Sequence, residues 1–344
     1  MKEKDLIVKA DTLTKRDTVV SIMIIGFLFF TFGFVSWINA ILIPFFKIAC
    51  ELDHFESYFV TFAFYISYLI FSVPSAYLLK KSGFKNGIMI GFWIIALGAF
   101  IFIPAALSRT YYLFLLGLFI IGAGLALLQT TANPYITILG PKERAAQRIS
   151  IMGICNKGAG ILAPLILASL ILRATDSSLF AQIPVMPAAE KSAALDELIR
   201  RVIPPYTFLG IFLFIMGILI RKSPLPDIDT EHESEGVAKA NVDKKNIFQF
   251  PHLVLGAIAI FLHVGTQVIS IDTIIGYAGS MNIDLLEARV FPSYTLTVTI
   301  AGYILGIICI PRFISQTNAL KACTFLGFIL VMLILFTRGQ VALL

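Results

Sequence analysis

Amide side chains lie inside long apolar stretches of this sequence, where each hydrogen-bonding group needs a partner. Gln129 and Asn133 are four residues apart, so they share one face of a helix, and Pro134 directly follows Asn133. Asn39 and Asn156 lie in two further apolar stretches. An amide carries donors and an acceptor, as each sugar hydroxyl does, so these residues predict a site for a hydroxyl-rich ligand. Amides also join helices inside membranes, and both interpretations are open for each residue.

Aromatic and imidazole side chains could complete such a site. The rings of Trp37, Tyr135 and Tyr277 are candidates to cover the apolar face of a sugar. His263 and Gln267 lie four residues apart in another apolar stretch and are further candidates to line the cavity. The imidazole of His263 could relay a proton, bind a sugar hydroxyl or stay neutral in a structural role, and all three roles are open.

Two charged side chains fall within apolar stretches. Asp272 is the carboxylate that we place within an expected span, near its outer end. A carboxylate there can bind a proton or a sodium ion in one conformation and release it in another, which couples an ion gradient to transport; it can also be hydrated at the outer mouth. Lys157 either assists this coupling or extends its amine to the inner membrane surface.

These side chains need a scaffold, and the composition predicts one that lies in a membrane. Of the 344 residues, 58% are hydrophobic and 14% are charged, with a mean hydropathy of +0.88. Apolar blocks of about 20 residues match a membrane-crossing helix, whereas a transmembrane barrel would show shorter, alternating segments. The composition excludes soluble enzymes, nucleic-acid-binding modules and disulfide scaffolds. The four cysteines lack paired spacing, so neither a disulfide nor a metal site is expected.

Nine membrane-spanning helices are expected from the apolar blocks between charged segments. They cover residues 20–43, 58–79, 88–107, 111–138, 149–172, 205–220, 252–278, 290–310 and 319–336. With the N-terminus inside, most of the 27 lysines and arginines fall on the cytoplasmic side, as the positive-inside rule requires. We therefore expect a cytoplasmic tail at residues 1–19.

Two polar segments interrupt the spans. The first contains AAEKSAALDELIRRVI and predicts a short amphipathic surface helix in an outer loop. The second, residues 221–247, is charged and predicts a cytoplasmic linker between a six-helix bundle at 20–220 and three spans at 248–344. The first span of each half carries a glycine and then a polar residue, Gly33 with Asn39 and Gly265 with Asp272, which indicates two related halves.

Four segments carry a resemblance to a known family. They read GFVSWINAILIPFFK at 33–47, LQTTANPYITILGP at 128–141, RISIMGICNKGAGILAP at 148–164 and FPHLVLGAIAIFLHVGTQV at 250–268. They resemble the fucose, galactose and glucose:proton symporter family of the major facilitator superfamily. The resemblance implies an all-α polytopic membrane protein whose two helical bundles import a hexose or deoxyhexose by alternating access at a central cavity. It also implies a multi-pass protein of the bacterial inner membrane that needs no cofactor.

The resemblance assigns the family's polar positions to residues of this sequence. The family's asparagine in the first helix matches Asn39, the polar position before its Ala-Asn-Pro turn matches Gln129, the turn's asparagine matches Asn133, and the fifth-helix asparagine matches Asn156. The aspartate that commonly follows the first of these is Ala40 here, and some members carry glutamate where Gln129 stands. We therefore expect any proton or sodium coupling at Asp272, with His263 or Lys157 assisting.

Length is a second departure from the family. Members have twelve spans, whereas this chain ends at VALL, where a tenth would begin, so the sequence predicts truncation after the ninth helix. A gene fragment, a natural short variant and an inactive remnant are all open.

Three functions compete. Ion-coupled hexose import is the first, and a transport-inactive remnant acting as a sugar-binding sensor or assembly partner is the second. Transport of an amine, drug or organic acid is the third, against which the Gln129 and Asn133 pair argues. An enzyme is not expected, because the sequence shows no metal-ligand spacing, nucleophile elbow or phosphate loop, and the glycines of IGAG at 121–124 predict helix packing.

Overall fold

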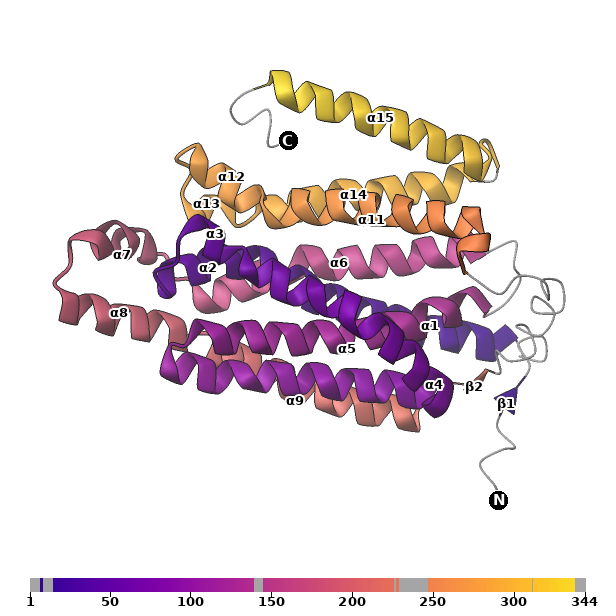
Figure 1. Cartoon of the computed structure of the whole chain (residues 1–344), viewed down its shortest axis with the longest axis horizontal. Coiled ribbons are helices and arrows are strands. Elements are labelled where there is room, and N and C mark those ends of the chain that lie inside the picture. Colours follow the sequence, from indigo (N-terminus) through magenta and orange to yellow (C-terminus); the bar gives the residue numbers. More distant parts are fainter. Residues whose placement is uncertain are drawn as a thin grey trace.

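The chain folds into long helices with short connections, seen from the side in Figure 1. The computed structural model describes residues 7–8, 15–138, 145–225, 227–228, 247–310 and 312–337. The first half contains β1 (Ile7–Val8), α1 (Lys15–Trp37), α2 (Asn39–Ala49), α3 (His54–Ser57), α4 (Phe59–Ser108), α5 (Tyr111–Ile138), α6 (Ala145–Ile171), α7 (Asp176–Gln182), η4 (Ile183–Val185), α8 (Ala188–Arg200) and α9 (Ile203–Lys222). The second contains β2 (Asp227–Ile228), η5 (Ile247–Gln249), α11 (Pro251–Asp272), α12 (Ile274–Ser280), α13 (Leu285–Ala288), α14 (Phe291–Cys309) and α15 (Gln316–Phe336).

Eight helical segments of the described residues are long and apolar enough to cross a membrane. The second of them, His54–Leu107, joins two of the expected spans. These two spans meet at Gly83, whose φ of 77° lies in the left-handed region that favours glycine. The nine expected spans are therefore accounted for, and the prediction of an all-helical polytopic protein is confirmed. The expected surface helix is α8, whose Leu195, Leu198 and Ile199 are buried.

The first long helix of each half is interrupted near the same end of the molecule. The expected span 20–43 divides at Ile38 into α1 and α2, and the expected span 252–278 divides at Thr273 into α11 and α12. Asn39 begins α2 and Asp272 ends α11, so each polar residue lies at an interruption. Discontinuous helices in membrane proteins are tolerated where the freed backbone groups lie within protein or line a cavity. Sequence periodicity predicts one continuous helix at each place, because the apolar pattern continues through the break.

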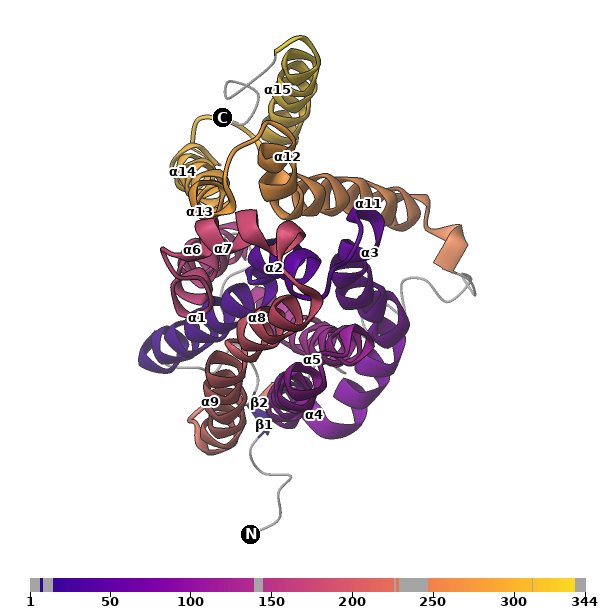
Figure 2. The same ribbon diagram turned by 90° about the vertical axis from the view of Figure 1, so that its left-hand side faces the viewer.

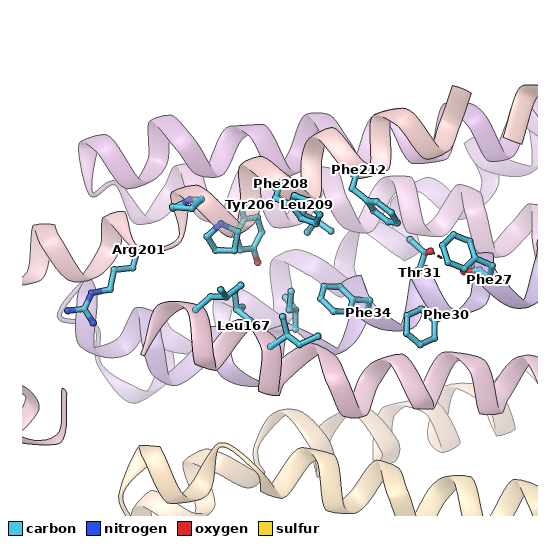
Figure 3. A pocket seen from close by; sticks show the side chains of 15 residues that line it. Phe27, Phe30, Thr31, Phe34, Leu167, Arg201, Tyr206, Phe208, Leu209 and Phe212 are labelled. Atoms are coloured by element: carbon cyan, nitrogen blue, oxygen red, sulfur yellow. Dashed lines mark hydrogen bonds between the residues drawn. The ribbon is translucent and has the colours of Figure 1, made fainter. Parts of the chain in front are cut away.

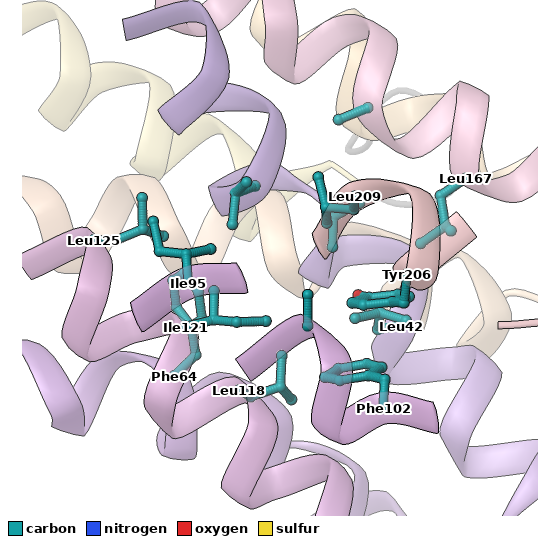
Figure 4. Close-up of a cluster of buried hydrophobic side chains, with 14 of the residues drawn as sticks. Leu42, Phe64, Ile95, Phe102, Leu118, Ile121, Leu125, Leu167, Tyr206 and Leu209 are labelled. Carbon is teal, nitrogen blue, oxygen red and sulfur yellow. The ribbon is translucent and has the colours of Figure 1, made fainter. Parts of the chain in front are cut away.

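The hydrophobic core lies in the first half of the chain, where α1, α2, α4, α5, α6 and α9 meet (Figure 4). Its centre is aromatic: the ring of Phe102 stacks on that of Tyr206 with centroids 3.8 Å apart. Phe46 and Phe114 pack beside them, with their own ring centroids 4.5 Å apart. These contacts tie α2, α4, α5 and α9 into one bundle.

Glycines allow α5 to approach both segments of α4 at backbone distance. A Cβ added to Gly122 would lie 2.3 Å from the carbonyl oxygen of Phe64, and one added to Gly124 would lie 2.7 Å from that of Gly91. Only glycine leaves room for such approaches, as in other close helix contacts within membranes. The interpretation of the glycines at 121–124 as packing residues is confirmed.

The second half of the chain contacts the first mainly through α14, which lies beside α6 (Figures 1 and 2). The hydroxyl of Ser293 donates to the carbonyl of Ile161 across this interface at 2.9 Å. Only the last two residues of α11, Ile271 and Asp272, are buried, and Figure 2 shows the rest of that helix leading away from the first half. The described side chains of α15 are mostly exposed, and in both views this helix lies at the outside.

The two short strands pair in parallel, with Ile7 opposite Asp227 and Val8 opposite Ile228. They bring a piece of the N-terminal segment beside the residues that follow α9. Most of the expected tail at 1–19, and residues 226 and 229–246 of the expected linker, lie outside the described residues.

The buried hydroxyl of Tyr206 permits a stability prediction. This hydroxyl has no hydrogen-bond partner among the described residues, so we expect Tyr206→Phe to leave thermal stability unchanged or to raise it by about 1 kcal/mol. Tyr206→Ala removes the ring that stacks on Phe102 and is expected to cost about 3–5 kcal/mol. Thermal unfolding in detergent measures both effects, and a marked loss in Tyr206→Phe would contradict the first.

Candidate functional site

Three of the candidate residues meet where α1 lies against α6. The indole Nε1 of Trp37 donates to the side-chain oxygen of Asn156 at 3.1 Å. The amide nitrogen of Asn156 in turn donates to the carbonyl of Phe29 at 3.3 Å. The ammonium of Lys157 lies over the indole, 3.9 Å from the ring centroid, in a cation–π contact. Direct contacts therefore bring Trp37, Asn156 and Lys157 together between α1 and α6.

The Trp37 ring is enclosed in this arrangement. It is 5% exposed, and it packs with Ile271 and Leu296 from the second half of the chain. A Cβ added to Gly160 would lie 2.5 Å from the ring, which leaves that side closed as well. In this conformation Trp37 links α1, α6 and the second half, and its faces are not open to a sugar.

Lys157 is a buried cation. It is 5% exposed, and no carboxylate among the described residues forms an ion pair with it. Its ammonium contacts the indole, and its side chain does not extend to the surface of the described part of the molecule. Burial of a cation without an anion is costly, which makes this position a candidate for a role in binding or coupling.

Asn39 is a buried amide without a partner. Its exposed fraction is 0%, and neither its oxygen nor its nitrogen makes a hydrogen bond within the described part of the chain. Leaving such a group unpaired costs about 1–3 kcal/mol, so natural proteins usually satisfy it with protein, water or ligand. Its place at the interruption between α1 and α2 suits contact with a ligand or water.

Asp272 joins the two halves of the chain. It is 2% exposed, and its Oδ2 accepts a hydrogen bond from the hydroxyl of Thr61 on α4 at 3.2 Å. Its Oδ1 has no partner among the described residues. At the same end, which carries α7, α8, α12 and α13 at the left of Figure 1, the hydroxyl of Ser177 donates to Asp284 at 2.5 Å. Two carboxylates of the second half therefore accept hydrogen bonds from the first half.

Gln129 has a partner that sequence reasoning missed. Its amide nitrogen donates to the hydroxyl of Tyr68 on α4 at 3.3 Å, and Ser36 of α1 lies beside Tyr68. The signal that could have revealed this contact is the spacing of hydroxyl-bearing residues at 58, 61, 65 and 68, three or four apart in an apolar helix. Three helices of the first half thus converge on one polar cluster.

The remaining candidates lie apart from these contacts. Asn133 and His263 are exposed and Gln267 is half-buried. None of the three makes a side-chain hydrogen bond within the residues that the structure describes. His263 and Gln267 lie on the part of α11 that leads away from the first half, and Asn133 lies one turn beyond Gln129 toward the end of α5. No group of three or more His, Cys, Asp or Glu side chains in the described ranges is placed to hold a metal ion.

An apolar cavity of about 560 Å³ lies between α1, α6 and α9 (Figure 3). The aromatic side chains that line it are Phe27, Phe30, Phe34, Tyr206, Phe208 and Phe212. Its polar lining is sparse, and the hydroxyl of Thr31 already donates to the carbonyl of Phe27 at 3.0 Å. None of the candidate sugar-binding residues lines this cavity. A lining of this kind suits hydrocarbon and not a sugar, so we do not place the candidate site there.

Residues 25–344 match the family described as the Major Facilitator Superfamily. The chain is 31% identical over 338 residues to the glucose/galactose transporter of Brucella abortus, which covers 96% of this chain and 76% of that protein. It is 30% identical over 342 residues to the L-fucose-proton symporter of Escherichia coli, with 98% of this chain and 77% of that protein covered.

Solved structures give the same picture. The fold is similar to the crystal structure of the E. coli fucose:proton symporter, with a TM-score of 0.72 and 28% sequence identity over 95% of this chain and 80% of that one. A further structure, a bacterial homologue of the lysosomal transporter Spinster in an inward-facing conformation, matches with a TM-score of 0.55 at 16% identity over 88% of this chain and 65% of that one. The latter likeness concerns the fold alone.

Proposed function

Because this chain belongs to the Major Facilitator Superfamily and is a multi-pass membrane transporter, we propose that it imports a hexose or deoxyhexose, namely fucose, galactose or glucose, together with a proton. The observation that carries this proposal is the similarity, over nearly the whole chain, to relatives named for these sugars. The chain is not an enzyme, and the alternative of an inactive sugar-binding remnant is not favoured. We place it in the bacterial inner membrane with its N-terminus in the cytoplasm.

The polar cluster of the first half supports a sugar site. Gln129 and Tyr68 present an amide beside a hydroxyl, and the unpaired amide of Asn39 lies on α2. Sugar hydroxyls donate and accept hydrogen bonds, so they can satisfy amide groups that otherwise stay unpaired. We assign Gln129, Asn39, Asn133 and Asn156 to sugar binding from the first half. His263 and Gln267 would join them when α11 approaches, and Trp37 would position Asn156 through its indole.

Asp272 is the residue that we propose for ion coupling. A carboxylate with one free oxygen, buried between the two halves, can take up a proton when the halves separate at this end and water enters. The proton neutralises the buried group, which favours closure of the halves around it. Lys157 is the second charged group of the proposed mechanism, because its buried ammonium lies on the indole that packs against Ile271. Sodium coupling is the alternative, and the experiment with imposed ion gradients distinguishes it from proton coupling.

Uptake of radiolabelled fucose, galactose and glucose into proteoliposomes tests the proposal. We expect accumulation of one or more of these sugars under an imposed inward proton gradient, and none in liposomes without protein. An inward sodium gradient that drives the same uptake without a proton gradient would replace proton coupling by sodium coupling. Failure of all three sugars to enter under either gradient would overturn the assignment.

The Gln129→Leu variant tests the sugar site separately. Leucine is similar in size to glutamine but lacks the amide that contacts Tyr68. A site that loses a hydrogen bond to its substrate leaves polar groups unpaired, so we expect sugar uptake to fall by about tenfold or more. Gln182→Leu, at an exposed glutamine in α7, is the matched control and should transport normally. Equal uptake by the two variants would remove Gln129 from the site.

A further inference from the structure

Four hydroxyl side chains form a stripe along the first segment of α4. Tyr58, at the start of this helix, is followed by Thr61, Tyr65 and Tyr68, at intervals of three, four and three residues that place them on one face. Apolar side chains of the same segment, such as Ile70, are exposed on other faces. We call these four residues the hydroxyl stripe. It runs through a part of the molecule that the sequence resemblance assigns no role.

One end of the hydroxyl stripe contacts the second half of the chain. Thr61 donates to Asp272 at 3.2 Å. The Tyr58 hydroxyl lies beside α12, because a Cβ added to Gly276 would be 2.7 Å from its oxygen. The stripe therefore begins at the carboxyl group that we propose for coupling.

The other end of the hydroxyl stripe contacts the proposed sugar site. The Tyr68 hydroxyl accepts a hydrogen bond from Gln129 of α5 at 3.3 Å and lies beside Ser36 of α1. The Tyr68 hydroxyl thus belongs to the polar cluster in which an amide is available for sugar hydroxyls. A single helix face connects this cluster to Asp272.

Tyr65 lies between the two ends. Its ring centroid is 5.9 Å from that of Tyr68, and it follows Thr61, the donor to Asp272, by one helical turn on the same face. The Tyr65 hydroxyl makes no hydrogen bond within the described residues. It is therefore a free donor and acceptor placed between the coupling group and the sugar-binding cluster.

We propose that Tyr65 is a positioning residue that links protonation of Asp272 to sugar binding, a role that rests on the proposed sugar transport. An ionised carboxylate only accepts hydrogen bonds, so it draws the Tyr65 hydroxyl toward itself as a donor. When a proton from water binds to the carboxylate, the neutral carboxyl accepts a hydrogen bond from this donor more weakly. The Tyr65 hydroxyl, which keeps its own proton throughout, then turns to a sugar bound at Tyr68 and Gln129. Sugar binding is tighter when Asp272 is protonated, as coupled transport requires.

The groups around Asp272 leave this link intact. The titratable side chains around its carboxyl are Tyr58, directly before α4, and Tyr65 on α4, and Thr61 supplies the neutral hydroxyl. No ion pair to Asp272 occurs among the described residues. Across the interface, Lys157 lies on the Trp37 ring, and that ring packs against Ile271, the neighbour of Asp272.

Sugar binding to the purified protein, measured by calorimetry over a pH series, tests the link. We expect wild-type affinity to rise as pH falls and Tyr65→Phe to lose this rise, with about tenfold weaker binding at the low-pH end, the effect of one missing hydrogen bond. Tyr77→Phe is the matched control, because Tyr77 is on the same helix and 73% exposed, and it should behave as wild type. Tyr68→Phe should weaken binding at every pH while keeping the pH dependence.

The outcomes separate the two proposals. A Tyr65→Phe protein with the wild-type melting temperature and the wild-type pH dependence of sugar binding would overturn the role of Tyr65 alone. Absence of binding of fucose, galactose and glucose to the wild type would overturn the proposed function and this role with it. If Tyr65→Phe does not fold, Tyr65→Trp and Tyr65→His supply the comparison, because both replacements keep a hydrogen-bonding side chain. Sugar binding by these two variants should retain more pH dependence than sugar binding by Asp272→Asn. Equal loss of the pH dependence in all three variants would contradict the role.

Discussion

The Asp272→Asn variant is expected to lose all accumulation of sugar against its gradient while still exchanging sugar across the membrane. The asparagine keeps the size of the side chain and its hydrogen bond from Thr61, but it cannot take up or release a proton. With no ion bound and released in each cycle, the sugar gradient and the proton gradient are no longer linked, so uptake stops at equal concentrations on both sides. The loaded carrier can still reorient, because the buried amide carries no charge.

Two assays on the same proteoliposomes measure this difference. Counterflow, in which unlabelled sugar inside drives entry of labelled sugar, should persist in Asp272→Asn, whereas accumulation driven by a proton gradient should disappear. Asp284→Asn is the matched control, since Asp284 also accepts a hydrogen bond from the first half but is exposed. Proton-driven accumulation by Asp272→Asn at the wild-type level would move the coupling site elsewhere.

Gly33→Ala is expected to cause a marked loss of folded, active protein. A Cβ at this position would lie 2.0 Å from the carbonyl oxygen of Asn156, far inside van der Waals contact with a backbone atom that cannot rotate away. The helices α1 and α6 would have to move apart, which breaks the Trp37 to Asn156 hydrogen bond and lifts Lys157 off the indole. Overpacking of this kind costs about 1–3 kcal/mol or more.

The matched control for Gly33→Ala is Gly158→Ala on the facing helix. A Cβ added to Gly158 meets nothing within 4 Å, although it is two residues from Asn156. We expect this variant to melt and to transport as wild type does, or to be slightly more stable because alanine favours helix. Yield, thermal unfolding in detergent and sugar uptake of the two variants give the comparison. Similar stability of both alanine variants would show that α1 and α6 are not in backbone contact at Gly33.

The helical scaffold could be predicted from the sequence, because burial in a membrane imposes a length and a polarity on each segment. The apolar blocks locate every long helix, and the glycines at 121–124 predict the close approach to α4 that the structure contains. The interruptions at Ile38 and Thr273 could not be predicted. Both positions continue an apolar pattern, and only the contacts of the surrounding helices decide where such a helix breaks.

The candidate site could be predicted in part. The placement of Asp272 at the end of a span follows from counting residues along a helix, and its burial follows from its contact with Thr61, more than two hundred residues away. The enclosure of Trp37 depends on how α6 and α14 are rotated about their axes, which one sequence does not contain. Gln129 illustrates the same limit, since its polarity indicates a partner but does not identify Tyr68.

The exposed positions of His263 and Asn133 have a different cause. His263 lies on α11, so whether it meets protein or water depends on where α11 stands relative to the first half, which is a property of the conformation. Asn133 is exposed near the end of α5. Both residues remain predictions for the site. The sequence shows that these side chains are polar, but it does not show which groups they contact.

The glycine contacts of α5 determine which distances can change when the transporter works. Because Gly122 and Gly124 hold α5 in close contact with both segments of α4, we expect Gln129 on α5 and Tyr65 and Tyr68 on α4 to move together as a rigid body. The relative displacement has to occur between that block and α11, so the separation of Thr61 and Asp272 is the natural reaction coordinate. The distance between spin labels on α4 and α11 should therefore change during the transport cycle, whereas the distance between labels on α4 and α5 should stay constant.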